Sequence, residues 1–268
     1  MDFGKIVGDS FAYAKEGLVG HYGKWIALII LSFLPVIPIM LGVIFGIVSV
    51  LANPESLNMA MLIPAIVITI ILAIILALPL LGYTVRIYRG DSPAPEINNW
   101  GALFSDGFKI FIIGLVYAIP VIIIGIVVLG SALLTIVMSA SEAMANPSDL
   151  MGLFGAVIFG ILLLAIVAFI IWLIEAMAVV RFARTNSIGE AFNFGEIFSR
   201  ISKIGVGSYI VALIIQAIIV GVIMFILELI PYIGFILVLI VTPIILLFQA
   251  RYLSQLYDSA GVDAPATV

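Results

Sequence analysis

The sequence offers few side chains that could do chemistry, and three of them stand inside long apolar stretches. Glu175 is a carboxyl, and Gln216 and Gln249 are amides. Catalysis within a membrane needs a nucleophile, a base or metal ligands held together, because a single side chain cannot both activate and position a reactant. The sequence contains no such cluster. It therefore predicts a non-enzymatic protein without catalytic, cofactor-binding or metal-binding residues.

Cysteine and histidine usage narrows the chemistry further. The chain has no cysteine and a single histidine, His21, which excludes disulfides, thiolate metal sites and multi-histidine clusters. His21 lies next to Tyr22, Lys24 and Trp25, a mixture typical of the membrane–water interface. With a formal net charge of −4, the chain also lacks the basic surface that a nucleic acid would require. We expect neither a cofactor nor a nucleic-acid partner.

The composition indicates a membrane protein. Of the 268 residues, 65% are hydrophobic and 10% are charged, too few to cover a surface in water. Uncharged windows longer than the roughly 20 residues that cross a bilayer occur six times. They span residues 25–54, 56–85, 110–141, 150–174, 204–227 and 229–250. Because these windows lack the amphipathic faces of buried helices in water, we predict an all-α integral membrane protein with six transmembrane helices.

The basic residues predict the orientation of the chain. In the six-helix arrangement, all 11 lysines and arginines fall on one side: Lys5, Lys15, Lys24, Arg86, Arg89, Lys109, Arg181, Arg184, Arg200, Lys203 and Arg251. Lysine and arginine favour cytoplasmic loops. We therefore predict a multi-pass protein of the cell membrane with cytoplasmic N- and C-termini. Acidic residues on that side nearly balance the basic ones, so the counts predict no polybasic lipid-binding patch.

A short pattern recurs three times along the chain. It consists of Asp or Asn, an aromatic residue and a glycine, at Asp2-Phe3-Gly4, Asn99-Trp100-Gly101 and Asn193-Phe194-Gly195. The Asp or Asn side chain can accept a hydrogen bond from a free amide of the next helical turn. Apolar residues then follow on one face, as in a helix that lies along the membrane interface. Each copy therefore predicts an N-capped amphipathic interfacial helix.

Other polar residues between the apolar windows also recur along the chain. Asn53-Pro54 returns as Asn146-Pro147, the pair Arg86 and Arg89 returns as Arg181 and Arg184, and the third copy keeps only Arg251. We interpret the chain as three helical hairpins, each preceded by an amphipathic interfacial helix. The predicted units are residues 1–98, 99–192 and 193–257, followed by a flexible tail at 258–268.

The Asp/Asn-aromatic-Gly patterns, the Asn-Pro pairs and the Arg-x-x-Arg pairs at the ends of the hairpins, called exits below, carry a family resemblance. Together they resemble an uncharacterised family of archaeal and some bacterial polytopic membrane proteins, a domain of unknown function. The resemblance covers residues 1–257. It implies a prokaryotic, most often archaeal, cell membrane and supplies no activity or functional residues.

The intramembrane polar residues define a candidate site made of Glu175, Gln216, Gln249, Arg86, Arg181 and Arg251. A free carboxylate within a span is costly, so Glu175 should be protonated, paired or facing water. Arg181 follows six residues later, which turns it about 120° away around a helix. We therefore expect Glu175 to pair with Arg86 or Arg251, the alternative being a neutral carboxyl bonded to a backbone carbonyl. Gln216 and Gln249 are expected to share an interhelical hydrogen bond.

Two functions remain open on the sequence alone. The scarcity of polar residues in the spans favours a non-enzymatic component that organises lipid or a membrane partner complex, with membrane lipids and either a protein partner or further copies of the chain as partners. The internal repeat and the prolines within spans favour a transporter or channel for a small or lipid-like solute. Those prolines predict either helix kinks, which are the more common outcome, or broken helices.

Overall fold

The structure is a computed structural model of the chain, and it describes residues 1–52, 59–143 and 147–261. Every regular element in these ranges is helical. The elements are α1 (Phe3–Leu18), α2 (Tyr22–Phe33), α3 (Val36–Ala52), α4 (Met59–Tyr88), α5 (Trp100–Ala143), α6 (Pro147–Thr185), the short 3₁₀ helix η1 (Ile188–Phe192), α7 (Phe194–Ile204), α8 (Val206–Glu228) and α9 (Gly234–Asp258).

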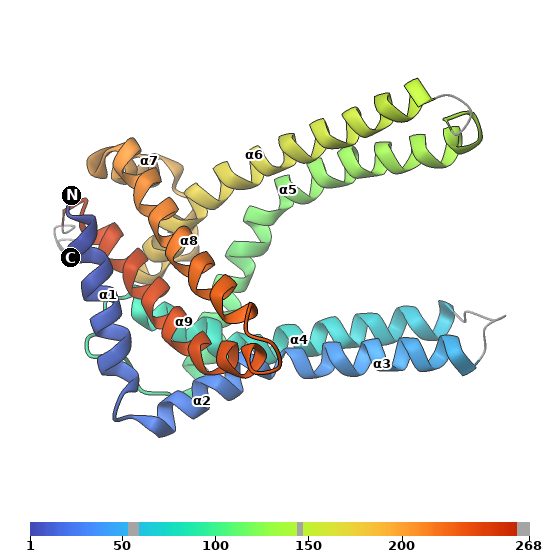
Figure 1. Cartoon of the computed structure of the whole chain (residues 1–268). Coiled ribbons are helices and arrows are strands. Elements are labelled where there is room, and N and C mark those ends of the chain that lie inside the picture. Colours follow the sequence, from blue (N-terminus) through green and yellow to red (C-terminus); the bar gives the residue numbers. More distant parts are fainter. Residues whose placement is uncertain (53–58, 144–146, 262–268) are drawn as a thin grey trace.

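Six of the described segments are long and apolar enough to cross a membrane, which confirms the predicted number of spans. They are Tyr22–Ala52, Ala60–Tyr88, Trp100–Ser131, Phe154–Thr185, Val206–Glu228 and Gly234–Asp258. Helices α3 and α4 lie side by side, as do α5 and α6, and both pairs extend away from a bundle that holds α1, α2, α7, α8 and α9 (Figure 1). The start of α1 and the end of α9 lie close together at the end of the bundle away from these pairs (Figure 1).

The prolines have two different effects. Pro35 separates α2 from α3, so the first span is a broken helix. The other prolines within spans are accommodated inside continuous helices: Pro38, Pro64, Pro79, Pro120 and Pro243. Helix α5, which contains Pro120, is visibly bent (Figure 1), as expected where a missing amide and a ring clash interrupt the hydrogen-bond ladder. Both sequence readings of the prolines therefore occur.

The three predicted helix starts are all present. The side chains of Asp2, Asn99 and Asn193 each accept a backbone amide three residues later, at 3.0, 3.4 and 3.3 Å. The second copy differs from the prediction because it is not a separate interfacial helix. Helix α5 continues from Trp100 to Ala143 without interruption. Pro147 is the first residue of α6, a position that proline favours because its missing amide is not needed there, whereas Asn53-Pro54 and Asn146 lie outside the described residues.

The apolar stripe of α1 does not face the membrane as expected. The Phe11 ring stacks on Phe248 of α9 with ring centroids 4.2 Å apart, and Phe3 and Val7 pack against the same buried core. Burying this stripe against α9 removes it from solvent as effectively as lipid would. Helix α1 is therefore part of the protein's core.

Glycines allow α4 and α5 to cross with their backbones in contact. A Cβ atom on Gly82 would lie 1.9 Å from the carbonyl oxygen of Leu103, and one on Gly107 would lie 1.9 Å from that of Leu78. Such close approach is possible only without side chains at these positions. The crossing fixes the start of α5 against the end of α4, next to the cavities described below.

Buried tyrosines connect the helices through their hydroxyl groups. Tyr252 of α9 donates to the carbonyl of Ala212 at 2.7 Å, and Tyr117 of α5 donates to that of Ala191 at 2.6 Å. Tyr13 of α1 donates to the carbonyl of Asp91 at 2.9 Å. Burial raises the pKa of Tyr13, so its hydroxyl stays protonated as the donor. These bonds let bulky amphipathic rings fill the core without an unsatisfied hydroxyl.

Candidate functional site

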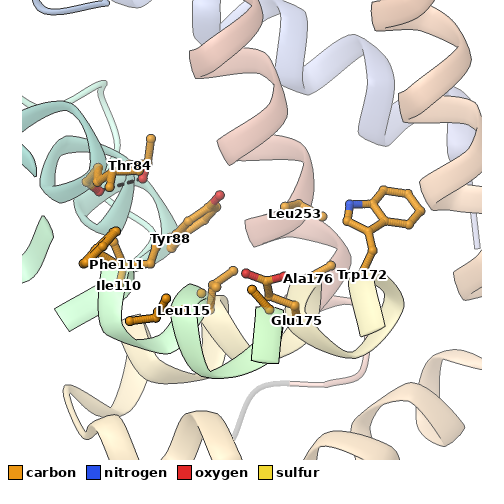
Figure 2. Close-up of a pocket in the computed structure, with 13 residues that line it drawn as sticks. Thr84, Tyr88, Ile110, Phe111, Leu115, Trp172, Glu175, Ala176 and Leu253 are labelled. Carbon is orange, nitrogen blue, oxygen red and sulfur yellow. Dashed lines mark hydrogen bonds between the residues drawn. The ribbon is translucent and has the colours of Figure 1, made fainter. Parts of the chain in front are cut away.

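A cavity of about 610 Å³ opens beside Glu175. Helices α4, α5, α6 and α9 line it, and most of the lining side chains are apolar. Figure 2 shows the Glu175 carboxylate directed into this cavity, with Tyr88, Leu253 and Trp172 around it. Glu175 is thus the acidic group of an otherwise apolar and aromatic pocket.

A second cavity, of about 440 Å³, adjoins the first and holds both predicted amides. Gln216 and Gln249 line it, and four residues line both cavities: Tyr88, Trp172, Ala176 and Leu253. Nε2 of Gln216 donates to the backbone carbonyl of Gln249 at 3.2 Å. The interhelical bond expected between the two glutamines therefore forms between α8 and α9, with the backbone of Gln249 as its acceptor.

The expected ion pair of Glu175 is not formed. Among the described residues, neither carboxylate oxygen of Glu175 has a hydrogen-bond or ion-pair partner, although the side chain is half-buried. Gly114 on α5 contributes space here, since a Cβ at that position would lie 3.4 Å from Oε1 of Glu175. The backbone-carbonyl alternative is also absent from this part of the chain. Glu175 therefore faces the cavity with no partner from the described part of the chain.

Arg86 is occupied elsewhere. Its guanidinium donates to the carbonyls of Glu96 and Asn98, at 2.9 and 2.7 Å, and to the Asn98 side chain at 2.9 Å. These acceptors belong to the segment that leads into α5 and its cap, Asn99. Arg86 thus holds the loop that follows its own helix.

Arg181 also holds the loop that follows its own helix. Its Nε donates to Oε2 of Glu190 at 2.7 Å, and its Nη2 contacts the same oxygen. The amide of Asn193, the α7 cap, also reaches Oε2 of Glu190, at 3.3 Å. Arg181 is therefore turned away from Glu175, as predicted, and it holds the loop before α7.

Arg251 contacts an aromatic ring. Its guanidinium carbon lies 4.9 Å from the centroid of the Tyr13 ring on α1, within the range of a cation–π contact. Of the six predicted site residues, Glu175, Gln216 and Gln249 therefore gather around adjoining cavities, and the three arginines do not join them.

Sequence reasoning missed a third cavity, which lies among basic residues. It measures about 610 Å³ and is lined by Arg89, Ala102, Ser105, Asp106, Lys109, Ala183, Arg184 and Asn186. Arg89 and Arg184 are the second arginines of the two Arg-x-x-Arg exits. That recurrence was the available signal. The nearly equal numbers of basic and acidic loop residues did not indicate this cavity, because such a count does not show which loops lie close together in space.

Contacts between distant segments bring the basic side of the protein together. Lys24 pairs with Glu96 at 2.6 Å, and the Arg89 guanidinium donates to Asn186 at 3.3 Å. Nη2 of Arg184 lies 2.7 Å from a carboxylate oxygen of Asp258. The N-terminal segment, the two long loops and the end of α9 thus form one connected face.

Comparison with protein families gives a match over much of the chain. A family model described as "Protein of unknown function (DUF4013)" matches residues 65–232. The chain belongs to this family. No curated protein and no solved structure matches the chain. The DUF4013 region includes Glu175, Gln216, Arg86 and Arg181, whereas Gln249 and Arg251 lie beyond its end. The resemblance to a domain of unknown function is therefore confirmed, over residues 65–232 of the 1–257 that the resemblance was expected to cover.

Proposed function

We propose that this chain is a non-enzymatic membrane protein that organises lipid, holding an amphipathic lipid-like molecule in the two adjoining cavities beside Glu175. The observation that carries the proposal is the lining of these cavities. Apolar and aromatic side chains suit an acyl chain, and Glu175, Gln216 and Gln249 supply the few polar contacts that orient a bound molecule.

The outer surface of the helices supports the same function. Side chains on the two extended pairs of helices are apolar and exposed, for example Ile70 at 52%, Ile126 at 68% and Phe159 at 70%. In the hydrocarbon core such surface is covered by lipid or by another apolar helix. Lipid, a membrane-protein partner and further copies of the chain are the partners that this surface accepts.

A variant that fills the junction of the two cavities tests the lipid proposal. Leu253 lines both cavities, whereas the half-buried Leu246, on the same helix, lines neither. Leu253→Trp should lower the amount of lipid that copurifies with the protein in mild detergent, and Leu246→Trp should retain it. Equal lipid content in both variants and the original protein would overturn the proposal.

Transport of a small or lipid-like solute is the second candidate. The observation in its favour is that one carboxylate and two amides meet at adjoining cavities within the spans. Thr84 lines the first cavity, and the chain has no native cysteine. For a transporter, Thr84→Cys should react with a charged, water-soluble thiol reagent. Reaction only with an apolar reagent would favour the lipid-holding function.

We place this protein in a prokaryotic cell membrane, with both termini and the segments around Arg86 and Arg181 in the cytoplasm. An archaeal source accords with the resemblance described above. The basic residues of the chain and the positive-inside tendency support this orientation. The contacts among those segments support it further, because they bring these segments onto one face.

We also propose that the chain consists of three related units, 1–98, 99–192 and 193–257, each a helical hairpin with an amphipathic opening. The capped helix starts support this view. The fourth residue after the cap is buried in each copy: Ile6 is 8% exposed, Leu103 is 0% and Ile197 is 1%. Trp100 and Phe194, which follow the caps of the second and third copies, are 50% and 47% exposed, as interfacial aromatic residues would be.

A further inference from the structure

We infer that the cavity among Arg89, Lys109 and Arg184 is a binding site for a phosphate group. These three cationic side chains come from the end of α4, from α5 and from the end of α6. They converge on one cavity of about 610 Å³. Its basic lining distinguishes this site from the apolar cavities beside Glu175. The inference is independent of the function proposed above.

The cationic side chains at this cavity have hydrogen-bond donors that residues 1–52, 59–143 and 147–261 leave unused. Nη2 of Arg184 is bound to Ser254 and Asp258, at 2.9 and 2.7 Å, whereas Nη1 makes no hydrogen bond to any described residue. Nζ of Lys109 has a single close carboxylate, Asp106, at 3.5 Å. A phosphate oxygen accepts several charge-assisted hydrogen bonds and therefore suits such a set of donors.

Two carboxylates in this network position the cations without cancelling them. Asp106 is buried and lies 2.8 Å from Arg89 and 3.5 Å from Lys109, while Asp258 holds Arg184 from outside the cavity lining. Three cationic groups against two carboxylates leave a net positive charge. The Asn186 side chain also accepts from Arg89, which fixes the guanidinium at the cavity. The site therefore attracts an anion and repels a cation.

The neighbouring surface indicates the depth of the cavity. Trp100, Phe104 and Phe108, in the first turns of α5, are 50%, 38% and 54% exposed. Exposed aromatic residues beside charged ones are typical of the membrane–water interface, where phospholipid phosphates lie. The phosphate could thus belong to a lipid headgroup or to a soluble phosphate compound, and both share the chemistry that this site recognises.

Two binding measurements on the full chain in neutral detergent distinguish these sources. In the first, native mass spectrometry compares phosphatidylglycerol with phosphatidylcholine of the same acyl chains. In the second, the unfolding midpoint is compared in sodium phosphate and in sodium chloride of equal ionic strength. Preferential retention of phosphatidylglycerol identifies a lipid headgroup. A higher midpoint in phosphate without lipid preference identifies a soluble phosphate.

Variants connect the binding to this cavity. Lys109→Gln removes one cation whose side chain is 30% exposed, and it should weaken the preferred ligand about tenfold, the loss expected for one hydrogen bond between charged groups. Lys203→Gln is the matched control, because Lys203 is exposed on α7 and does not line the cavity. Arg89→Gln provides a second variant if Lys109→Gln fails to fold. Binding of neither phosphate source, or an equal loss in Lys203→Gln, would overturn the inference.

Discussion

Nε of Arg181 lies 2.7 Å from Oε2 of Glu190, nine residues further along the chain. The same carboxylate receives the side-chain amide of Asn193, which caps α7. Arg86 holds the loop before Asn99 in a comparable way, although its acceptors are backbone carbonyls and an amide. In both places an arginine at the end of a span orients the next helix by holding the connecting loop.

The first prediction concerns this ion pair. Arg181→Gln should destabilise the protein by about 2 kcal/mol, because it removes hydrogen bonds between charged groups in a partly buried site. Arg181→Lys should recover only part of the loss, since an ammonium group cannot direct two N–H groups of one planar fork to the same Glu190 oxygen. The measurement is thermal unfolding in detergent.

A double-mutant cycle with Glu190→Gln isolates the pair. The sum of the stability losses in the two single variants should exceed the loss in the double variant, because both substitutions break the same contact. Strictly additive losses would mean that Arg181 and Glu190 stabilise the protein through other neighbours.

The second prediction concerns Glu175. Glu175→Gln should leave the unfolding midpoint unchanged or raise it, because the substitution removes a charge from a half-buried position without breaking a pair among the described residues. Glu190→Gln is the control, since that carboxylate has Arg181 as its partner. A clear loss of stability in Glu175→Gln alone would show that the carboxylate is paired after all.

The difference between Glu190 and Glu175 shows how far the sequence can predict such contacts. Span positions follow from uncharged length, and helix starts follow from caps that bond three residues ahead. These are local properties of the chain. The partner of Arg181 is also close in sequence, but the sequence analysis predicted a contact for the deeper Glu175 instead. The surroundings of Glu175 depend on how four helices pack, which the sequence does not show.

The positions of Arg89, Lys109 and Arg184 illustrate the same limit. Each residue is an ordinary loop or helix-end cation in the sequence, and only the packing of α6 beside the crossing of α4 with α5 brings them to one cavity. The glycines that permit this crossing, Gly82 and Gly107, are spaced 25 positions apart on different helices, so no motif within one helix reveals them. A further glycine, Gly42 of α3, also lies close to α4, since a Cβ there would lie 2.6 Å from Oγ1 of Thr69.

The third prediction concerns this crossing. Gly82→Ala should destabilise the protein by about 3 kcal/mol, the upper end of the usual cost of overpacking, because the added methyl meets backbone and not a flexible side chain. Gly101→Ala is the control, because a Cβ there has no atom within 4 Å and alanine favours helix. Thermal unfolding of both variants measures the difference. Equal stability of the two would mean that α4 and α5 do not approach each other so closely.

The fourth prediction concerns orientation across the membrane, which single introduced cysteines can test in this cysteine-free chain. Tyr232, 99% exposed in the turn between α8 and α9, lies on the side opposite to the basic face. Ser92 is exposed in the segment between α4 and α5, on the basic face. If the basic face is cytoplasmic, Tyr232→Cys should react with a membrane-impermeant thiol reagent in intact cells and Ser92→Cys should not.

Permeabilising the cells provides the control for this experiment. Ser92→Cys should then become reactive, which would show that its earlier protection came from the membrane and not from burial. The original chain should stay unlabelled throughout, because it has no thiol. Labelling of Ser92→Cys but not Tyr232→Cys in intact cells would reverse the orientation and place the phosphate-binding cavity on the outer surface. In that case the lipids of the outer leaflet would be the ones within its reach.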